Sequence, residues 1–177
     1  MKLSRLPPAW QIALFIFVVA AIFWLGAVNI RAVIGNDLLK PRTLEFEEYL
    51  APEAELEIFR LISISSVVVL ISYSVALISS IVFLSTSPFK LKQHGWLFMS
   101  AILFYLFVPV ELFTMYLDGK MIYLEFFTTA SNAVFRELFI ARVGALAGAP
   151  VIALLCYYTI IALAIFQPLK KPNSPSV

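Results

Sequence analysis

Hydrophobic positions along the chain fall into four long blocks, separated by segments that are polar or rich in proline and glycine. The first block, Trp10–Val28, contains nineteen residues without a charge. A helix rises about 1.5 Å per residue, so about 20 apolar residues cross the hydrocarbon core of a bilayer. The pattern therefore predicts four transmembrane helices, over residues 10–34, 58–84, 96–117 and 138–166.

These blocks predict an all-α, polytopic membrane protein in which two antiparallel helical hairpins form one domain over residues 1–170. Residues 171–177 are polar and proline-rich, which is typical of a tail without regular structure. Because this end lies on the same side as the N-terminus, we expect the tail to be cytoplasmic.

Two connections show an amphipathic pattern. The segment 43–50 ("TLEFEEYL") places Phe46, Tyr49 and Leu50 on one helical face, and 131–139 ("SNAVFRELF") has a similar pattern. We expect the first to form a short helix on the extracytoplasmic membrane surface. The second is expected to be an amphipathic lead-in to the fourth helix, with Ser131 as its N-cap. Pro52 is expected to open the second long helix, because proline is favoured at the first helical position.

Composition supports the membrane class. Hydrophobic residues make up 62% of the chain and charged residues 14%, whereas a soluble domain averages about 45–50% and about 25%. The net charge of +2 excludes a strongly basic, nucleic-acid-binding class. Cys156 is the single cysteine, so the chain cannot form an intrachain disulfide.

Lysine and arginine indicate the orientation. The N-terminus, the 85–95 loop and the C-terminal tail together contain six of these residues and no carboxylate. The opposite side holds the other seven, together with every Asp and Glu of the chain. Positive residues concentrate in short cytoplasmic segments. We therefore expect both termini to be cytoplasmic, in the plasma membrane or bacterial inner membrane.

A carboxylate interrupts the third apolar block, in the segment "VPVELF". At 100° per residue, the strongly polar residues of this helix fall on one face, within about 80° of arc. A polar face of this kind looks into a bundle rather than at lipid. Pro109 removes one helical hydrogen bond, which predicts a bend just below Glu111. The residues on this face are Ser100, Phe104, Phe107, Glu111, Thr114 and Asp118.

A buried carboxylate needs a partner or a proton. Arg31, Arg60 and Arg142 lie at the outer ends of the other three spans, near the level of Glu111. Arg142 is the preferred partner, and the four residues form one candidate site at the outer mouth. Three interpretations follow: a structural ion pair, a site for a small anion or lipid headgroup, and a proton relay. The relay is the weakest, because no second acid lies deeper in a span.

Small residues predict two helix-packing faces. One lies on the second span and the other on the fourth, where a GxxxG pair is also present. The residues of the second span are Ser65, Ser72, Ala76 and Ser79, and those of the fourth are Gly144, Ala145, Gly148 and Ala149.

The sequence lacks the residues that several kinds of cofactor, metal and nucleotide site require. His94 is the only histidine and is expected to be a solvated interfacial residue, so a bis-histidine haem site is excluded. No zinc-ligand cluster or phosphate-binding loop is present. We therefore expect no catalytic, cofactor-binding or metal-binding residues, and a protein that is not an enzyme.

Two functions fit this pattern. The first is a non-catalytic membrane subunit that assists, assembles or stabilises a larger complex of membrane proteins. The second is a binding or transport protein for a lipid, a quinone or another amphiphile, with its site at the outer mouth of the bundle.

Overall fold

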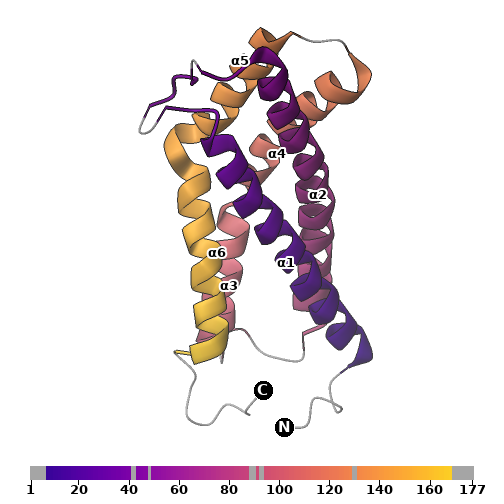
Figure 1. Cartoon of the computed structure of the whole chain (residues 1–177). Coiled ribbons are helices and arrows are strands. Elements are labelled where there is room, and N and C mark those ends of the chain that lie inside the picture. The colour runs from indigo at the N-terminus through magenta and orange to yellow at the C-terminus, as the bar shows by residue number, and fades with distance from the viewer. Residues whose placement is uncertain are drawn as a thin grey trace.

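The computed structural model describes residues 7–40, 43–47, 49–87, 91, 94–128 and 131–168, without the side chains of Ala145 and Ala147. The tail predicted at 171–177 lies outside this range. The described chain is helical (Figure 1). Its elements are α1 (Pro8–Asn36), α2 (Pro52–Ser85), α3 (Gly95–Leu106), α4 (Val108–Phe127), α5 (Asn132–Val143), the 3-10 helix η3 (Ala145–Gly148) and α6 (Ala149–Phe166).

Among the described residues, four stretches are helical, long and apolar enough to cross a membrane. They are Pro8–Asn36, Pro52–Ser85, Gly95–Phe127 and Ala149–Phe166. The predicted all-α class is therefore confirmed, and so is the presence of four helical segments long and apolar enough to cross a membrane. As predicted, α2 begins at Pro52.

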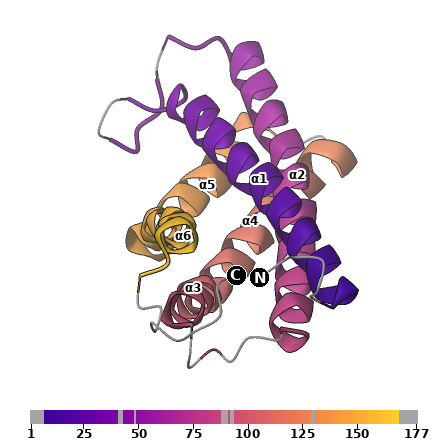
Figure 2. The ribbon, with the colours of Figure 1, turned by 90° about the horizontal axis from the view of Figure 1, so that it is seen from below.

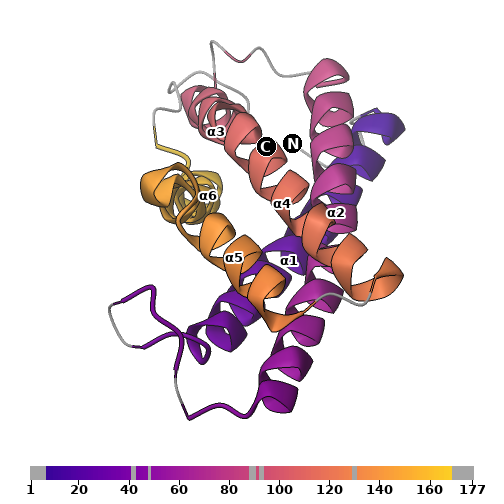
Figure 3. The same cartoon turned by 90° about the horizontal axis from the view of Figure 1, so that it is seen from above.

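The helices form two groups that meet at α4. Helix α1 packs along α2, α3 packs against α6, and α4 packs against α2. Seen from below and from above, α1 and α2 lie on one side, α3 and α6 on the other, and α4 between them (Figures 2 and 3). The start of α1 and the end of α6 lie at the same end of the molecule (Figure 1).

The third span is interrupted at the predicted place. Helix α3 ends at Leu106 and α4 begins at Val108, with Pro109 at its N-terminus. Proline is tolerated there because the first helical N–H groups have no intrahelical acceptor. The interruption at Phe107 places Glu111 in the first turn of α4. The partial positive charge of a helix N-terminus favours a carboxylate at this position.

The fourth span is not the continuous helix predicted over residues 138–166. Helix α5 ends at Val143, and α6 starts only at Ala149. Gly148 adopts a left-handed conformation with φ of 86°, and Pro150 follows at the start of α6. A left-handed residue cannot continue a right-handed helix, and proline supplies no N–H to one.

Within the described chain, the two glycines of the predicted packing face do not contact another helix closely. Gly144 is exposed, and a Cβ atom added to Gly148 would meet no neighbouring atom within 4 Å. Ala149 is half-buried, and the side chain of Ala145 lies outside the described part. On α2, Ser72, Ala76 and Ser79 are buried and Ser65 is half-buried.

The segment after α1 is not the predicted surface helix. Its described residues, 43–47 and 49–50, form bends and an isolated antiparallel bridge between Leu39 and Phe46. The reason is tertiary packing: the Phe46 ring lies 6.3 Å from the Phe59 ring and 6.1 Å from the Phe139 ring. His94 is also buried at the start of α3, whereas the sequence suggested a solvated residue.

Two hydrophobic cores are stacked along the bundle. The central core contains Trp24, Val69, Tyr73, Phe104, Ala153 and Tyr157. The second, which we call the end core, contains Leu38, Phe59, Ile62, Met121, Phe135 and Phe139. On α1, residue 31 lies midway between Trp24 of the central core and Leu38 of the end core. Arg31 of the candidate site therefore lies between two apolar cores.

Candidate functional site

A buried charged layer lies between the two cores, and we define it as Arg31, Ser66, Glu111, Asp118 and Arg142. Arg31 donates from Nη1 to Asp118 Oδ2 at 2.6 Å and to Ser66 Oγ at 2.9 Å. Arg142 donates from Nε to Asp118 Oδ1 at 3.0 Å. One carboxylate thus bridges two guanidinium groups, and α4 links α1 to α5.

The central member of this layer, Asp118, was not among the candidate site residues. The sequence placed it on the polar face of the third span, but just beyond the predicted end of that span. Helix α4 continues to Phe127, so Asp118 lies inside the bundle with a relative exposure of 0%. Its seven-residue spacing from Glu111, two helical turns, was the signal that could have found it.

Glu111 has a different partner from the predicted one. Its Oε1 accepts a hydrogen bond from the Tyr157 hydroxyl at 3.1 Å, whereas Arg142 contacts Asp118. The predicted direct pair of Glu111 and Arg142 is therefore wrong. Among the described residues, Glu111 makes no ion pair within 4.0 Å.

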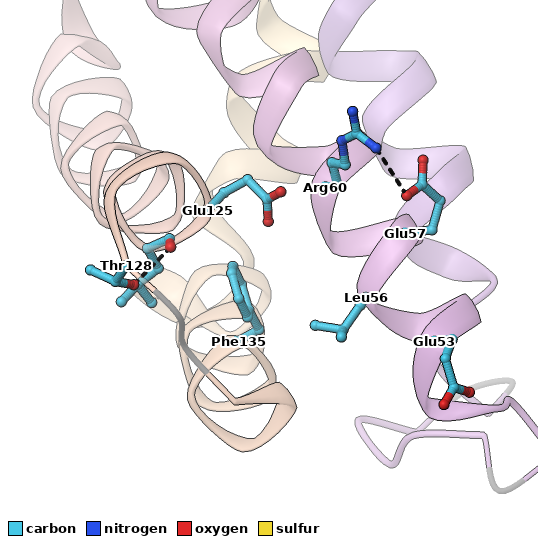
Figure 4. Close-up of a pocket in the computed structure, with 8 residues that line it drawn as sticks. Glu53, Leu56, Glu57, Arg60, Glu125, Thr128 and Phe135 are labelled. Carbon is cyan, nitrogen blue, oxygen red and sulfur yellow. Dashed lines mark hydrogen bonds and ion pairs between the residues drawn. The ribbon is translucent and has the colours of Figure 1, made fainter.

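Arg60 does not join the charged layer. Its side chain is exposed and pairs with Glu57, one turn earlier on α2, with Nη1 at 3.4 Å from Oε2. Figure 4 shows this pair beside Glu125 and Phe135, in a separate pocket of about 260 Å³. An exposed ion pair of this kind contributes little to stability. The predicted four-residue mouth thus reduces to Arg31, Glu111 and Arg142.

These three residues line one cavity of about 390 Å³. Arg31 comes from α1, Glu111 from α4 and Arg142 from α5, and Tyr157 of α6 also lines the cavity. The volume lies within the range of small-molecule sites, about 300–1,000 Å³. Apolar side chains form much of the remaining wall: Val28, Leu39, Phe139, Val143, Val151 and Leu154.

The cavity offers hydrogen-bond donors that the described residues do not use. Arg142 contacts Asp118 through Nε alone, and its two terminal nitrogens donate no hydrogen bond to another described residue. Its side chain keeps 17% of its surface exposed, against 6% for Arg31. A guanidinium presents five N–H donors in a planar fork that matches carboxylate and phosphate. Arg142 is therefore the residue best placed to bind an anion in the cavity.

A second buried ionic contact, also missed by the sequence analysis, holds α5 in place. Glu55 accepts two hydrogen bonds from Arg136, at 2.5 and 2.7 Å, and one from Asn132 at 3.2 Å. The hydrogen bonds to this carboxylate raise the pKa of the Arg136 guanidinium above its usual value. The contact fixes the start of α5 on α2 and so positions Arg142 at the other end of the same helix.

Among the described residues, no group of three or more His, Cys, Asp or Glu side chains is arranged to hold a metal ion. Comparison with protein-family models, with curated proteins and with solved structures finds no match to this chain. The function is therefore argued from the charged layer and its cavity.

Proposed function

We propose that this protein is a non-catalytic, multi-pass membrane protein that binds an amphiphile in the cavity of the charged layer. One observation carries the proposal: Arg31, Glu111 and Arg142 line the same cavity of about 390 Å³, whose other walls are largely apolar. Apolar walls with a few polar groups are the usual form of a small-molecule site. The arginines would hold the polar head, and the apolar walls the part of the ligand that enters from the membrane.

The cost of the charged layer supports a binding role. Burying an ion pair removes two charges from water, and apolar residues of similar volume often stabilise a protein as well or better. Arg31 and Asp118 are 5% and 0% exposed. A ligand that uses the remaining donors would explain why charges occupy a position between two apolar cores.

Binding can be measured by native mass spectrometry of protein extracted in a mild detergent. We expect wild-type protein to retain a lipid-sized adduct, and Arg142→Gln to lose it. The matched control is Arg60→Gln, because Arg60 lies on the exposed surface of α2 outside this cavity. Absence of an adduct from the wild-type protein, or an equal adduct on Arg142→Gln, would contradict the proposal.

For the orientation, we propose that both termini face the cytoplasm of the plasma membrane or bacterial inner membrane, so that the charged layer lies nearer the outer surface. Cysteines can be introduced at the exposed positions Glu53 and Ser85 in a Cys156→Ser background. An impermeant maleimide added to intact cells should label position 53 and not position 85. The opposite labelling would reverse the orientation.

Membership in a larger membrane complex is the second candidate function. Its supporting observation is the low burial of α6. In the most apolar stretch of this helix only 11% of the residues are buried, against 33% in that of α2. A helix with so little intramolecular contact has room for a protein partner. Mass measurement of the purified particle distinguishes the two candidates, since a stoichiometric second protein favours the subunit and a lone chain with a lipid adduct favours the binding protein.

A further inference from the structure

The charges that line the cavity are balanced. Arg31 and Arg142 contribute two positive charges, and Asp118 and Glu111 can contribute two negative ones, so the fully ionised layer is neutral. A ligand with a net negative charge would leave a buried excess of charge, which is costly in a low-dielectric region. A ligand with one positive and one negative group would not.

Glu111 does not take part in the ion pairs of the layer. Asp118 is occupied by both arginines, whereas Glu111 makes no ion pair among the described residues and accepts one hydrogen bond, from Tyr157. Glu111 and Tyr157 both line the cavity. A cation from the ligand would give this carboxylate the partner that it lacks.

We propose that the ligand carries a zwitterionic head, a phosphate joined to an ammonium, as in phosphatidylethanolamine. The phosphate binds the terminal nitrogens of Arg142, and the ammonium binds the free oxygen of Glu111. Tyr157 and Phe139 also line the cavity, and aromatic faces attract cations within about 6 Å of the ring centre. This inference rests on the amphiphile-binding function proposed above and specifies the class of ligand.

The test is competition between two lipids in native mass spectrometry. Purified protein is mixed with equal amounts of dioleoyl phosphatidylethanolamine and dioleoyl phosphatidylglycerol, which share their chains and differ in the head. We expect the zwitterionic lipid to be retained about tenfold more, the ratio that one charge-assisted hydrogen bond typically provides. Glu111→Gln should abolish or reverse the preference, because the layer then carries one net positive charge.

Glu57→Gln is the matched control, since Glu57 is an exposed carboxylate that pairs with Arg60 outside the cavity. It should leave the lipid ratio unchanged, and the melting temperature of both variants confirms that they are folded. A separate titration with soluble glycerophosphoethanolamine, which carries the same neutral zwitterionic phosphodiester, shows whether the head alone binds. Displacement of the lipid by this compound, lost in Glu111→Gln, would assign recognition to the head and support the inference.

The outcomes separate the two proposals. If neither lipid nor glycerophosphoethanolamine binds the wild-type protein, the amphiphile-binding function itself is wrong. If both lipids are retained equally, or if Glu111→Gln leaves the preference intact, the cavity binds amphiphiles but does not recognise a zwitterion, and the inference made here is overturned.

Discussion

The charged layer and the central core occupy neighbouring levels of the same bundle but are built by different means. In the central core, Trp24 lies with its ring centre 4.8 Å from that of Tyr73 and 4.6 Å from that of Tyr157. In the layer, the contacts are ionic and converge on Asp118. Aromatic side chains stabilise a bundle without requiring one specific partner for each ring. Each buried charge, in contrast, requires a group of opposite charge beside it.

The serines of α2 show the same contrast. Ser72 and Ser79 donate to carbonyl groups one turn earlier on their own helix, which is how an isolated hydroxyl is satisfied in an apolar environment. Ser66, which belongs to the charged layer, instead accepts a hydrogen bond from Arg31. The local residue type is identical, and the surroundings decide whether it joins a network between helices.

The largest effect is expected from removing one charge of the layer. Arg31→Gln leaves Asp118 with a single arginine inside the bundle, and breaking a buried ion pair typically costs about 3–5 kcal/mol of unfolding free energy. Denaturation in detergent micelles measures this loss. Arg60→Gln breaks an exposed pair, for which about 0.2–1 kcal/mol is expected. Equal effects at the two positions would mean that burial of the layer does not govern its energetics.

An intermediate effect is expected on the buried face of α2. Ala76 is 0% exposed, and Ala76→Leu forces extra volume into this contact, which costs about 1–3 kcal/mol. Ala54→Leu, at an exposed position of the same helix, provides the control. Wild-type thermal stability of Ala76→Leu would show that this face of α2 is not closely packed.

The smallest effect distinguishes two serines. Ser66→Ala removes an acceptor of Arg31. A hydrogen bond contributes about 1 kcal/mol to stability, and the contribution is larger when the donor is charged, as it is here. Ser72→Ala should be nearly silent, because the carbonyl to which Ser72 donates keeps its helical bond. Thermal melting of the two variants side by side is the measurement. A larger loss of thermal stability in Ser72→Ala than in Ser66→Ala would contradict the distinction between the charged layer and the rest of α2.

The sequence predicted those features that depend on local pattern. The four apolar blocks follow from length and hydropathy, and the interruption near Glu111 follows from the chemistry of Pro109. The polar face that contains Glu111 and Asp118 follows from helical periodicity. Each of these can be derived without knowing which helices are neighbours.

Other features depend on tertiary neighbours or on competing local signals. Glu55 and Arg136 are 81 residues apart, and nothing near either residue identifies the other as its partner. Phe46 lies in an amphipathic pattern, but packing on Phe59 outweighs the weak tendency of a short segment to form a helix. Gly148 and Pro150 both favour a break before α6. The long apolar run around them favours one continuous span, and the prediction followed the apolar run.

The most direct test asks whether the charged layer serves binding rather than stability. The quadruple variant Arg31→Met, Glu111→Gln, Asp118→Leu, Arg142→Met replaces all four charges of the layer with uncharged residues of similar volume. Such replacements are often neutral or stabilising, so the variant should fold with a melting temperature at least equal to that of the wild type. Native mass spectrometry of the folded variant is the decisive measurement. We expect the lipid adduct to be absent, and an adduct retained at the wild-type level would show that the charged layer does not bind the ligand.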